Sequence, residues 1–318
     1  MDGSASAGKG PRAARYCLAG SLGEAAAVLG QAPSDVLLLA GGTDVMVRAR
    51  DRVRQAPVVD VSRLPELRRI ERDGADLVLG AGVTWGECLA DPRIAADAPI
   101  LGEVAERFAS PQIRAVATLG GNVANASPAG DGVAALWALE ARVEALTPDG
   151  PAVRGLDEVV AGPGRLALPR GSLLVGFRVP ARVPGEGQAF YKLVNRAWPE
   201  HPMAIAVASV AARVRLDDRG RAALARIVLG AVGPTPLRVP EGEAALLGRR
   251  PAEWDLGAVG RAARAAARPI SDLRASAAYR GAVLPGLVAA ALARAAAHAG
   301  APAPPSTPDG RPGGWATA

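Results

Sequence analysis

Two glycine pairs, Gly41–Gly42 and Gly120–Gly121, constrain the fold of this chain more than any other feature. The first pair follows the apolar run 36–40 and precedes Thr43 and Asp44, which can cap a following helix. Glycine adopts positive φ and lets another group approach the backbone closely. Successive backbone N–H groups in such a turn form a concave anion site. An ordinary strand-to-helix turn explains this segment equally well.

The second pair lies in the polar segment 117–131, between two stretches predicted to be helical. Five side chains in it carry hydrogen-bonding groups: Thr118, Asn122, Asn125, Ser127 and Asp131. Loops this long are usually functional or disordered, and flanking apolar helices argue against disorder. Two such turns can present two sets of backbone donors to one pyrophosphate. Neither segment matches the G-x-G-x-x-G fingerprint or a P-loop.

Histidine and cysteine are too scarce for most side-chain catalysis. Cys17 and Cys88 cannot complete an iron–sulfur or thiol-rich zinc site, and we expect both to be buried free thiols. We place His298 on the surface of a C-terminal helix, so a catalytic triad would have to use His201. We therefore predict no catalytic residue and no metal ligand. Any redox chemistry would belong to a cofactor.

The net charge of +6 does not indicate a nucleic-acid partner, because the basic residues are spread along the chain and aromatic residues are few. Residues 48–54 form the only dense basic cluster. No apolar run approaches the length of a membrane span, and the N-terminus lacks the apolar stretch of a secretory signal. We expect a cytoplasmic protein without a membrane span.

The apolar pattern predicts an α+β fold with two domains, 13–182 and 188–298, between disordered tails at 1–12 and 299–318. Capping boxes begin at Ser21 and Thr84. The predicted strands are 36–40, 58–61, 67–70, 77–81, 142–146, 173–179, 189–194, 204–214 and 222–232, with 67–70 and 77–81 paired as a hairpin. The predicted helices are 25–29, a short one after Thr84, 95–108, 132–139, 252–267 and 275–297.

Five segments, in order, carry a resemblance to a known family. They are Ala40–Asp44 (AGGTD), Gly80–Thr84 (GAGVT), Thr118–Asp131 (TLGGNVANASPAGD), Gly230–Arg238 (GAVGPTPLR) and Asp272–Arg280 (DLRASAAYR). The chain resembles the FAD-binding medium subunit of the molybdenum hydroxylases, which include xanthine dehydrogenases and carbon monoxide dehydrogenases. The resemblance runs through nearly the whole folded chain.

The resemblance implies a two-lobed FAD-binding domain of the p-cresol methylhydroxylase/vanillyl-alcohol oxidase type, followed by a smaller α+β domain. It implies non-covalent FAD with its pyrophosphate on Leu38–Val45 and Thr118–Asn122. The implied cofactor-binding residues are Leu38, Leu39, Ala40, Gly41, Gly42, Thr43, Asp44, Val45, Phe108, Thr118, Gly120, Gly121, Asn122, Asp131, Leu174 and Lys192. Phe108 matches a position that packs beside the cofactor, and Asp131 one that reaches it through hydrogen bonds. Lys192 also stands out as the only lysine of the predicted folded part.

The same resemblance implies an electron-transfer subunit of a heterotrimer. A large molybdopterin-binding subunit would oxidise the substrate, and a small subunit with two [2Fe–2S] clusters would pass electrons to FAD here. The acceptor would be NAD, a quinone or oxygen. Xanthine dehydrogenase-type relatives often carry an Arg-Arg pair followed by acidic residues, whereas segment 195–202 here is NRAWPEHP. This difference weakens the prediction of a nicotinamide acceptor, although a surface turn of different length explains it equally well.

Two other functions fit the sequence less well. One is a stand-alone flavin oxidoreductase of the same fold, such as the reductase of cell-wall amino-sugar synthesis, for which we find no set of substrate-binding and proton-donating groups. The other is a flavin-free scaffold that bridges two partner subunits.

Overall fold

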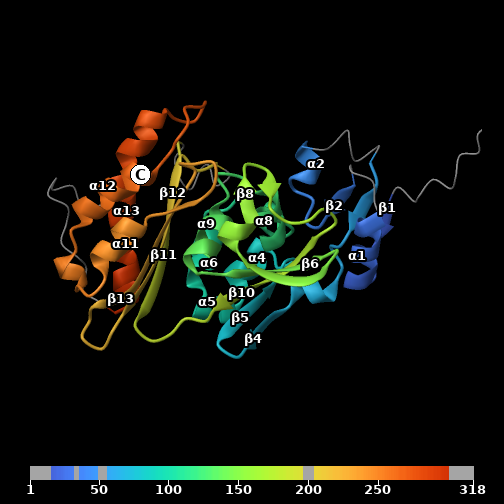
Figure 1. The fold of residues 1–318 in the computed structure, drawn as a ribbon, viewed down its shortest axis with the longest axis horizontal. Coiled ribbons are helices and arrows are strands. Elements are labelled where there is room, and N and C mark those ends of the chain that lie inside the picture. Colours follow the sequence, from blue (N-terminus) through green and yellow to red (C-terminus); the bar gives the residue numbers. More distant parts are fainter. Residues whose placement is uncertain (1–15, 32–35, 49–55, 196–203, 301–318) are drawn as a thin grey trace, which may run out of the picture.

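The computed structural model describes residues 16–31, 36–48, 56–195 and 204–300, which form three bodies in a row (Figure 1). A small N-terminal lobe lies at one end, a larger second lobe in the middle and a C-terminal domain at the other end. The predicted α+β class is confirmed. His201, most of segments 48–54 and 195–202, and nearly all of both predicted tails lie outside the described residues.

The N-terminal lobe is a parallel three-stranded sheet in the order β1-β3-β2. Its elements are β1 (Tyr16–Leu18), α1 (Leu22–Gln31), β2 (Leu37–Leu39), α2 (Val45–Arg48) and β3 (Val58–Asp60). The Ser21 hydroxyl accepts from the Glu24 N–H at 3.1 Å, whereas the Glu24 carboxylate accepts from the Gly20 N–H at 2.7 Å. One of the two bonds of the predicted capping box is therefore present, and in the other the Glu24 carboxylate accepts from Gly20 instead of Ser21.

The second lobe is built on an antiparallel sheet in the order β4-β5-β10-β6-β7. Its strands are β4 (Ile70–Asp73), β5 (Asp76–Gly80), β6 (Arg142–Thr147), β7 (Gly150–Gly155) and β10 (Leu173–Pro180), with a separate ribbon of β8 (Val160–Gly162) and β9 (Arg165–Leu166). Its helices are η1 (Pro65–Arg68), α4 (Trp85–Ala90), α5 (Pro92–Asp97), α6 (Pro99–Glu106), α7 (Pro111–Arg114), α8 (Leu119–Asn125), α9 (Asp131–Ala138) and α10 (Leu156–Val159).

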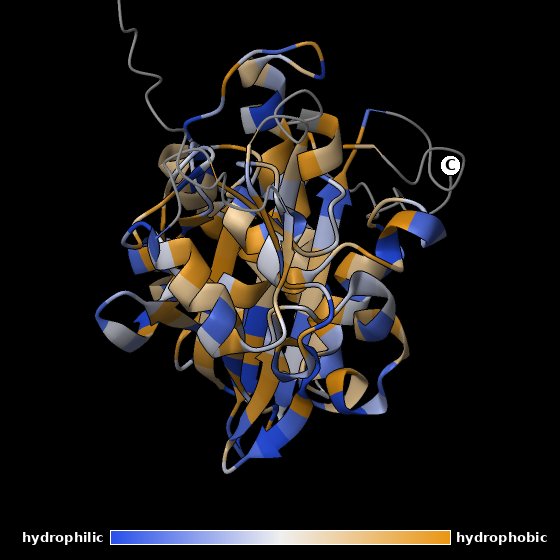
Figure 2. Ribbon diagram, turned by 90° about the vertical axis from the view of Figure 1, so that its right-hand side faces the viewer, coloured by the Kyte–Doolittle hydropathy of each residue, from blue (hydrophilic) through white to orange (hydrophobic). Residues whose placement is uncertain are grey.

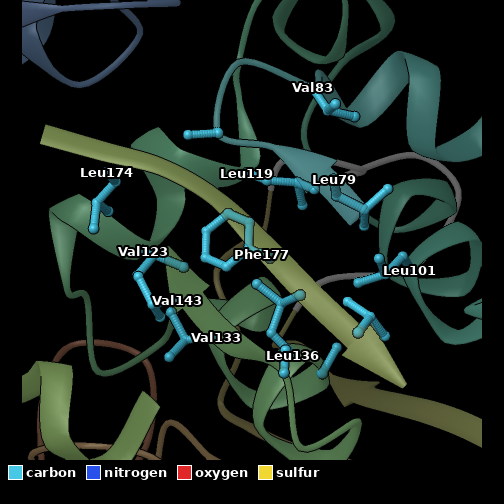
Figure 3. Close-up of a cluster of buried hydrophobic side chains, with 14 of the residues drawn as sticks. Leu79, Val83, Leu101, Leu119, Val123, Val133, Leu136, Val143, Leu174 and Phe177 are labelled. Carbon is cyan, nitrogen blue, oxygen red and sulfur yellow. The ribbon is translucent and has the colours of Figure 1, made fainter. Parts of the chain in front are cut away.

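The core of this lobe surrounds Phe177 of β10, whose side chain is completely buried (Figure 3). Leu119 and Val123 of α8 lie beside it, as does Leu136 of α9. The second glycine pair lies in the first turn of α8, so burial of the apolar face of this helix fixes the pair on the sheet.

The C-terminal domain is an antiparallel sheet in the order β11-β12-β13-β14, with helices covering one face (Figure 1). Its elements are β11 (Glu186–Leu193), β12 (Ala208–Leu216), β13 (Ala222–Gly230), β14 (Leu237–Arg238), α11 (Pro240–Leu246), η2 (Pro251–Glu253), α12 (Leu256–Ala266) and α13 (Ala277–His298). Strands β11 and β12 contact α6 and α9 of the second lobe. In the molecule as a whole, hydrophobic residues gather along strands in the middle of the view, and hydrophilic residues are frequent at its edge (Figure 2).

Three predicted elements differ from the structure. The predicted helix 95–108 is two helices, because Ala98 precedes Pro99 and a residue before proline is disfavoured in helical conformation. The first half of the predicted strand 67–70 lies in the 3-10 helix η1, which Pro65 initiates, and the hairpin strand is β4, which starts only at Ile70. The segment 117–131 is not a loop throughout, because Thr118 caps α8 within it.

Helix α13 corrects the expectation about apolar length. Its 22 residues are long and apolar enough to cross a membrane by length and composition. However, Leu284, Val288 and Leu292 are completely buried in the core of the C-terminal domain. The helix therefore serves as a core element of this domain.

Candidate FAD-binding site

A cavity of about 480 Å³ lies where the two lobes meet, within the size range of small-molecule sites. Both glycine pairs contribute to its wall. Of the sixteen predicted cofactor-binding residues, these thirteen line it: Leu38, Ala40, Gly41, Gly42, Thr43, Asp44, Val45, Phe108, Thr118, Gly120, Gly121, Asn122 and Leu174. Leu39, Asp131 and Lys192 lie outside the lining.

Gly41 and Gly120 allow the walls of the cavity to pack against one another. A Cβ atom at Gly41 would lie 1.9 Å from the Val116 carbonyl oxygen, so the two glycine-rich segments touch there. A Cβ atom at Gly120 would lie 2.6 Å from the Cβ of Ala81. Neither distance is compatible with a side chain, so both positions require glycine for packing.

Gly42 and Gly121 also line the cavity, and an added Cβ atom at either would approach a side chain rather than backbone, with Leu39 Cδ1 at 3.1 Å from a Cβ atom at Gly42. Gly42 has a φ of 72°, a conformation that favours glycine. A Cβ atom at Gly121 would meet only the Thr118 hydroxyl oxygen within 4 Å, at 2.9 Å.

The backbone N–H groups of the two glycine segments differ in whether they have a hydrogen-bond acceptor within the protein. In the second segment all four N–H groups from Leu119 to Asn122 are paired. Leu119 donates to the Val83 carbonyl and Gly120 to the Ala81 carbonyl, at 2.9 and 2.8 Å. The N–H groups of Gly121 and Asn122 donate to the hydroxyl and the carbonyl of Thr118, at 2.9 and 3.0 Å.

In the first segment the N–H groups of Gly41, Gly42 and Thr43 have no acceptor among the described residues. These three consecutive donors belong to residues that line the cavity, whereas the four donors from Leu119 to Asn122 are all used by the protein itself. The structure thus differs from the expectation of two donor sets, because Thr118 caps α8 and Gly120 packs on the end of β5. An anion such as a pyrophosphate fits the first segment.

Two buried acceptors near the second segment have no partner. Asn122 Oδ1 and Asp131 Oδ1 are buried, and neither has a hydrogen-bond donor among the described residues. An unpaired buried polar atom is costly unless a ligand or water completes its hydrogen bonding. Of these two residues only Asn122 lines the cavity, so it is the one that can offer an acceptor to a cofactor bound there.

Asp131 and Lys192 form a buried ion pair behind the cavity wall. Lys192 Nζ lies 2.7 Å from Asp131 Oδ2 and donates to the Arg107 carbonyl at 3.2 Å. Burial raises the pKa of the Asp131 carboxyl, and the Lys192 ammonium opposes that shift. Lys192 lies on β11 and Asp131 on α9, so the pair joins the C-terminal domain to the second lobe.

Sequence reasoning missed two parts of the cavity wall. Trp85 stacks on Phe108 with ring centroids 4.9 Å apart and an interplanar angle of 28°, and both rings line the cavity. The segment from Leu166 to Leu173 closes another side. The tryptophan beside the Thr84 cap was a usable signal, whereas nothing local linked segment 166–173 to the glycine pairs.

The two cysteines and His298 can be compared with their expected environments. Cys88 is a buried free thiol as predicted, and burial raises its pKa, whereas Cys17 is only half-buried. His298 is exposed, with Nδ1 2.7 Å from the Gln188 carbonyl oxygen. Within the described ranges no group of three histidine, cysteine or acidic residues is arranged to hold a metal ion.

The fold and the cavity define a class of protein, a two-lobed nucleotide-cofactor-binding domain joined to a smaller α+β domain. Residues 12–182 match the family model described as the FAD binding domain in molybdopterin dehydrogenase. Residues 190–295 match the carbon monoxide dehydrogenase flavoprotein C-terminal domain. The chain therefore belongs to the family of FAD-binding subunits of the molybdenum hydroxylases.

Individual relatives agree with this assignment. The carbon monoxide dehydrogenase medium chain of Hydrogenophaga pseudoflava is 34% identical over 275 residues, covering 86% of this chain and 93% of the relative. The putative xanthine dehydrogenase FAD-binding subunit of Escherichia coli K12 is 34% identical, covering 72% and 78%. A solved structure of carbon monoxide dehydrogenase from H. pseudoflava superposes with a TM-score of 0.83 at 35% identity, covering 89% of this chain and 97% of that chain.

Proposed function

We propose that this chain is the electron-transfer subunit of a heteromeric molybdenum hydroxylase and holds one non-covalent FAD in the cavity between its lobes. The observation that carries the proposal is the row of unpaired N–H groups at Gly41, Gly42 and Thr43, facing a cavity that the second glycine segment also lines. When bound, FAD supplies the capacity to accept and release electrons singly or in pairs.

The role of the chain itself is to bind and orient. The Gly41–Thr43 donors hold the pyrophosphate, and Asn122 supplies an acceptor to the polar part of the cofactor. Leu174 and Phe108 supply apolar wall for the ring system. The resemblance implies Asp131, Lys192 and Leu39 as further cofactor-binding residues, and we propose that they support the cavity wall from outside its lining.

We infer that electrons arrive from [2Fe–2S] clusters on a small partner subunit and leave to NAD, a quinone or oxygen. Substrate is oxidised at molybdopterin on a large partner subunit. Named relatives from carbon monoxide and xanthine dehydrogenases support this assignment. We further propose a cytoplasmic location, the domain division 13–182 and 188–298, and disordered tails at 1–12 and 299–318.

The test uses the purified chain reconstituted with FAD and reduced with dithionite under anaerobic conditions. The proposal expects the reduced chain to be reoxidised by at least one of NAD⁺, a soluble quinone or oxygen, without any organic substrate of its own. Co-expression with a large molybdopterin-type chain and a small cluster chain from the same operon is expected to give a stable heterotrimer.

Each alternative function gives a different outcome. A chain that turns over an organic substrate alone supports the stand-alone oxidoreductase. A chain that joins the complex without flavin supports the scaffold. Either result contradicts the proposal.

A further inference from the structure

The turn that follows α6 carries Phe108 into the cavity, and its backbone is strained. Ala109 has a φ of 45°, in the left-handed region that residues other than glycine rarely adopt. Strained backbone of this kind persists only where surrounding groups hold it. The groups that hold this turn therefore decide where the Phe108 ring lies.

Cationic side chains, not backbone groups, satisfy the carbonyls of this turn. The Arg114 guanidinium donates through the same NH1 group to the Phe108 carbonyl at 3.0 Å and to the Ala109 carbonyl at 3.1 Å. Lys192 donates to the preceding carbonyl of Arg107. The described part of the chain offers the Phe108 and Ala109 carbonyls no backbone N–H.

The ring behind Phe108 is fixed much more firmly. Trp85 is completely buried and is the first residue of α4, directly after the N-cap Thr84 of the capping box. Gly132 packs flat on it, since a Cβ atom at that position would lie 2.5 Å from the indole ring. In this stack the Trp85 ring is therefore fixed, whereas the position of the Phe108 ring depends on the turn.

Arg114 is placed to connect the two. It ends α7, and a Cβ atom at Gly86 of α4 would lie 3.3 Å from the Arg114 carbonyl oxygen. The helix that carries Arg114 is therefore packed on the helix that carries Trp85, while the Arg114 side chain holds the turn that carries Phe108.

We propose that Arg114 is a positioning residue for the flavin ring. It sets the position of the flavin by holding the Phe108–Trp85 stack against the cavity. This proposal rests on the proposed function, because it assigns that wall to the ring system of FAD. A planar ring stacks best on a wall held at fixed distance and tilt. Loosening the turn changes how the oxidised and reduced rings are held, and thus changes flavin affinity and potential.

The experiment compares Arg114→Gln, Arg114→Lys, Phe108→Leu and the double variant Arg114→Gln/Phe108→Leu in the full chain. Arg154→Gln, on exposed β7, is the matched control. We expect Arg114→Gln to weaken FAD binding about tenfold, with altered visible circular dichroism and midpoint potential of the bound flavin. Arg114→Lys keeps a cationic donor, so we expect its FAD affinity, circular dichroism and midpoint potential to lie close to those of wild type.

The double variant separates positioning from general stability. If Arg114 acts through Phe108, replacing Arg114 has little further effect on the flavin once Phe108 is leucine. Additive effects, or a wild-type flavin spectrum and potential in Arg114→Gln, overturn the proposal.

A flavin-free measurement distinguishes this proposal from the proposed function. We expect faster hydrogen exchange across residues 106–117 in the Arg114→Gln apoprotein than in wild type and Arg154→Gln. Unchanged exchange there overturns the claim that Arg114 holds the turn. Failure of the wild-type chain to bind FAD at all instead overturns the proposed function.

Discussion

Gly41 and Val116 lie in backbone contact, so close that a Cβ atom on residue 41 would lie 1.9 Å from the Val116 carbonyl oxygen. This contact brings the two glycine segments, more than seventy residues apart in sequence, to one wall of the cavity. The first glycine of the first pair is therefore needed for the protein's own packing, while its neighbours Gly42 and Thr43 offer donors to a ligand.

Replacing Gly41 by alanine is expected to separate the two segments. The added methyl group has no space, and overpacking of this kind costs about 1–3 kcal/mol. We expect urea unfolding to show that loss and FAD titration to show weakened binding. Gly286→Ala is the control, since a Cβ atom at Gly286 meets nothing within 4 Å and alanine favours the helix. Equal stability of Gly41→Ala and wild type would contradict the packing role.

Removing the Lys192 charge is expected to destabilise the chain strongly. Lys192→Met leaves Asp131 buried without its partner, which costs about 3–5 kcal/mol at neutral pH. Adding Asp131→Asn removes the uncompensated charge and should recover much of that loss. Chemical unfolding of wild type and the two variants measures both effects, and a double variant no more stable than Lys192→Met contradicts this explanation.

The Lys192→Met defect is expected to depend on pH. Burial raises the pKa of Asp131 in the folded state, so the folded state favours the protonated acid. Stability then falls as pH rises through that raised pKa and recovers as pH falls below it. The stability gap to wild type should therefore narrow toward acidic pH in an unfolding series, whereas a constant gap contradicts the assignment to Asp131.

Asp272 gives the opposite dependence. The backbone N–H of Arg274 is the main cause that lowers its pKa, with help from Ala275 and Arg280. An acid with a lowered folded pKa stabilises fully above its unfolded pKa, about 3.9, and loses that stabilisation as pH falls further. Asp272→Asn should therefore melt below wild type at pH 7, with the difference shrinking below about pH 4. A difference that grows in acid contradicts this prediction.

Local signals in the sequence predicted the elements that local chemistry decides. The Thr84 hydroxyl accepts from the Glu87 N–H at 3.2 Å, and the Glu87 carboxylate accepts from the Thr84 N–H at 2.8 Å, as the spacing indicated. The strands of the C-terminal sheet follow their apolar runs. The break at Ala98 was readable from Pro99, but the apolar pattern that continues across it favoured one helix.

The site was predictable in its members but not in its chemistry. Whether a glycine N–H is free depends on whether an acceptor lies near it, and the Gly120 acceptor is the Ala81 carbonyl, directly after the distant strand β5. The partner of Lys192 likewise depends on the packing of β11 against α9, which the sequence does not show. Tertiary contacts of this kind leave no trace in residue spacing.

FAD itself is expected to stabilise the folded chain. A ligand that binds only the native state adds about 2.7 kcal/mol at a concentration one hundred times its Kd. Differential scanning fluorimetry of the apoprotein should therefore show a melting temperature that rises with FAD concentration and does not rise with riboflavin, which lacks phosphate. Equal stabilisation by riboflavin contradicts a pyrophosphate site at Gly41–Thr43.

The most direct test of the account is the flavin content of the purified chain, measured for wild type and Gly121→Val. Gly121 lines the cavity, and a Cβ atom there would lie 2.9 Å from the Thr118 hydroxyl, which accepts from the Gly121 N–H, with no other atom within 4 Å. We predict a yellow wild-type protein that releases one FAD per chain in acid, and a folded Gly121→Val variant without flavin. A colourless wild-type protein that FAD cannot reconstitute, or full flavin occupancy in Gly121→Val, would contradict the account.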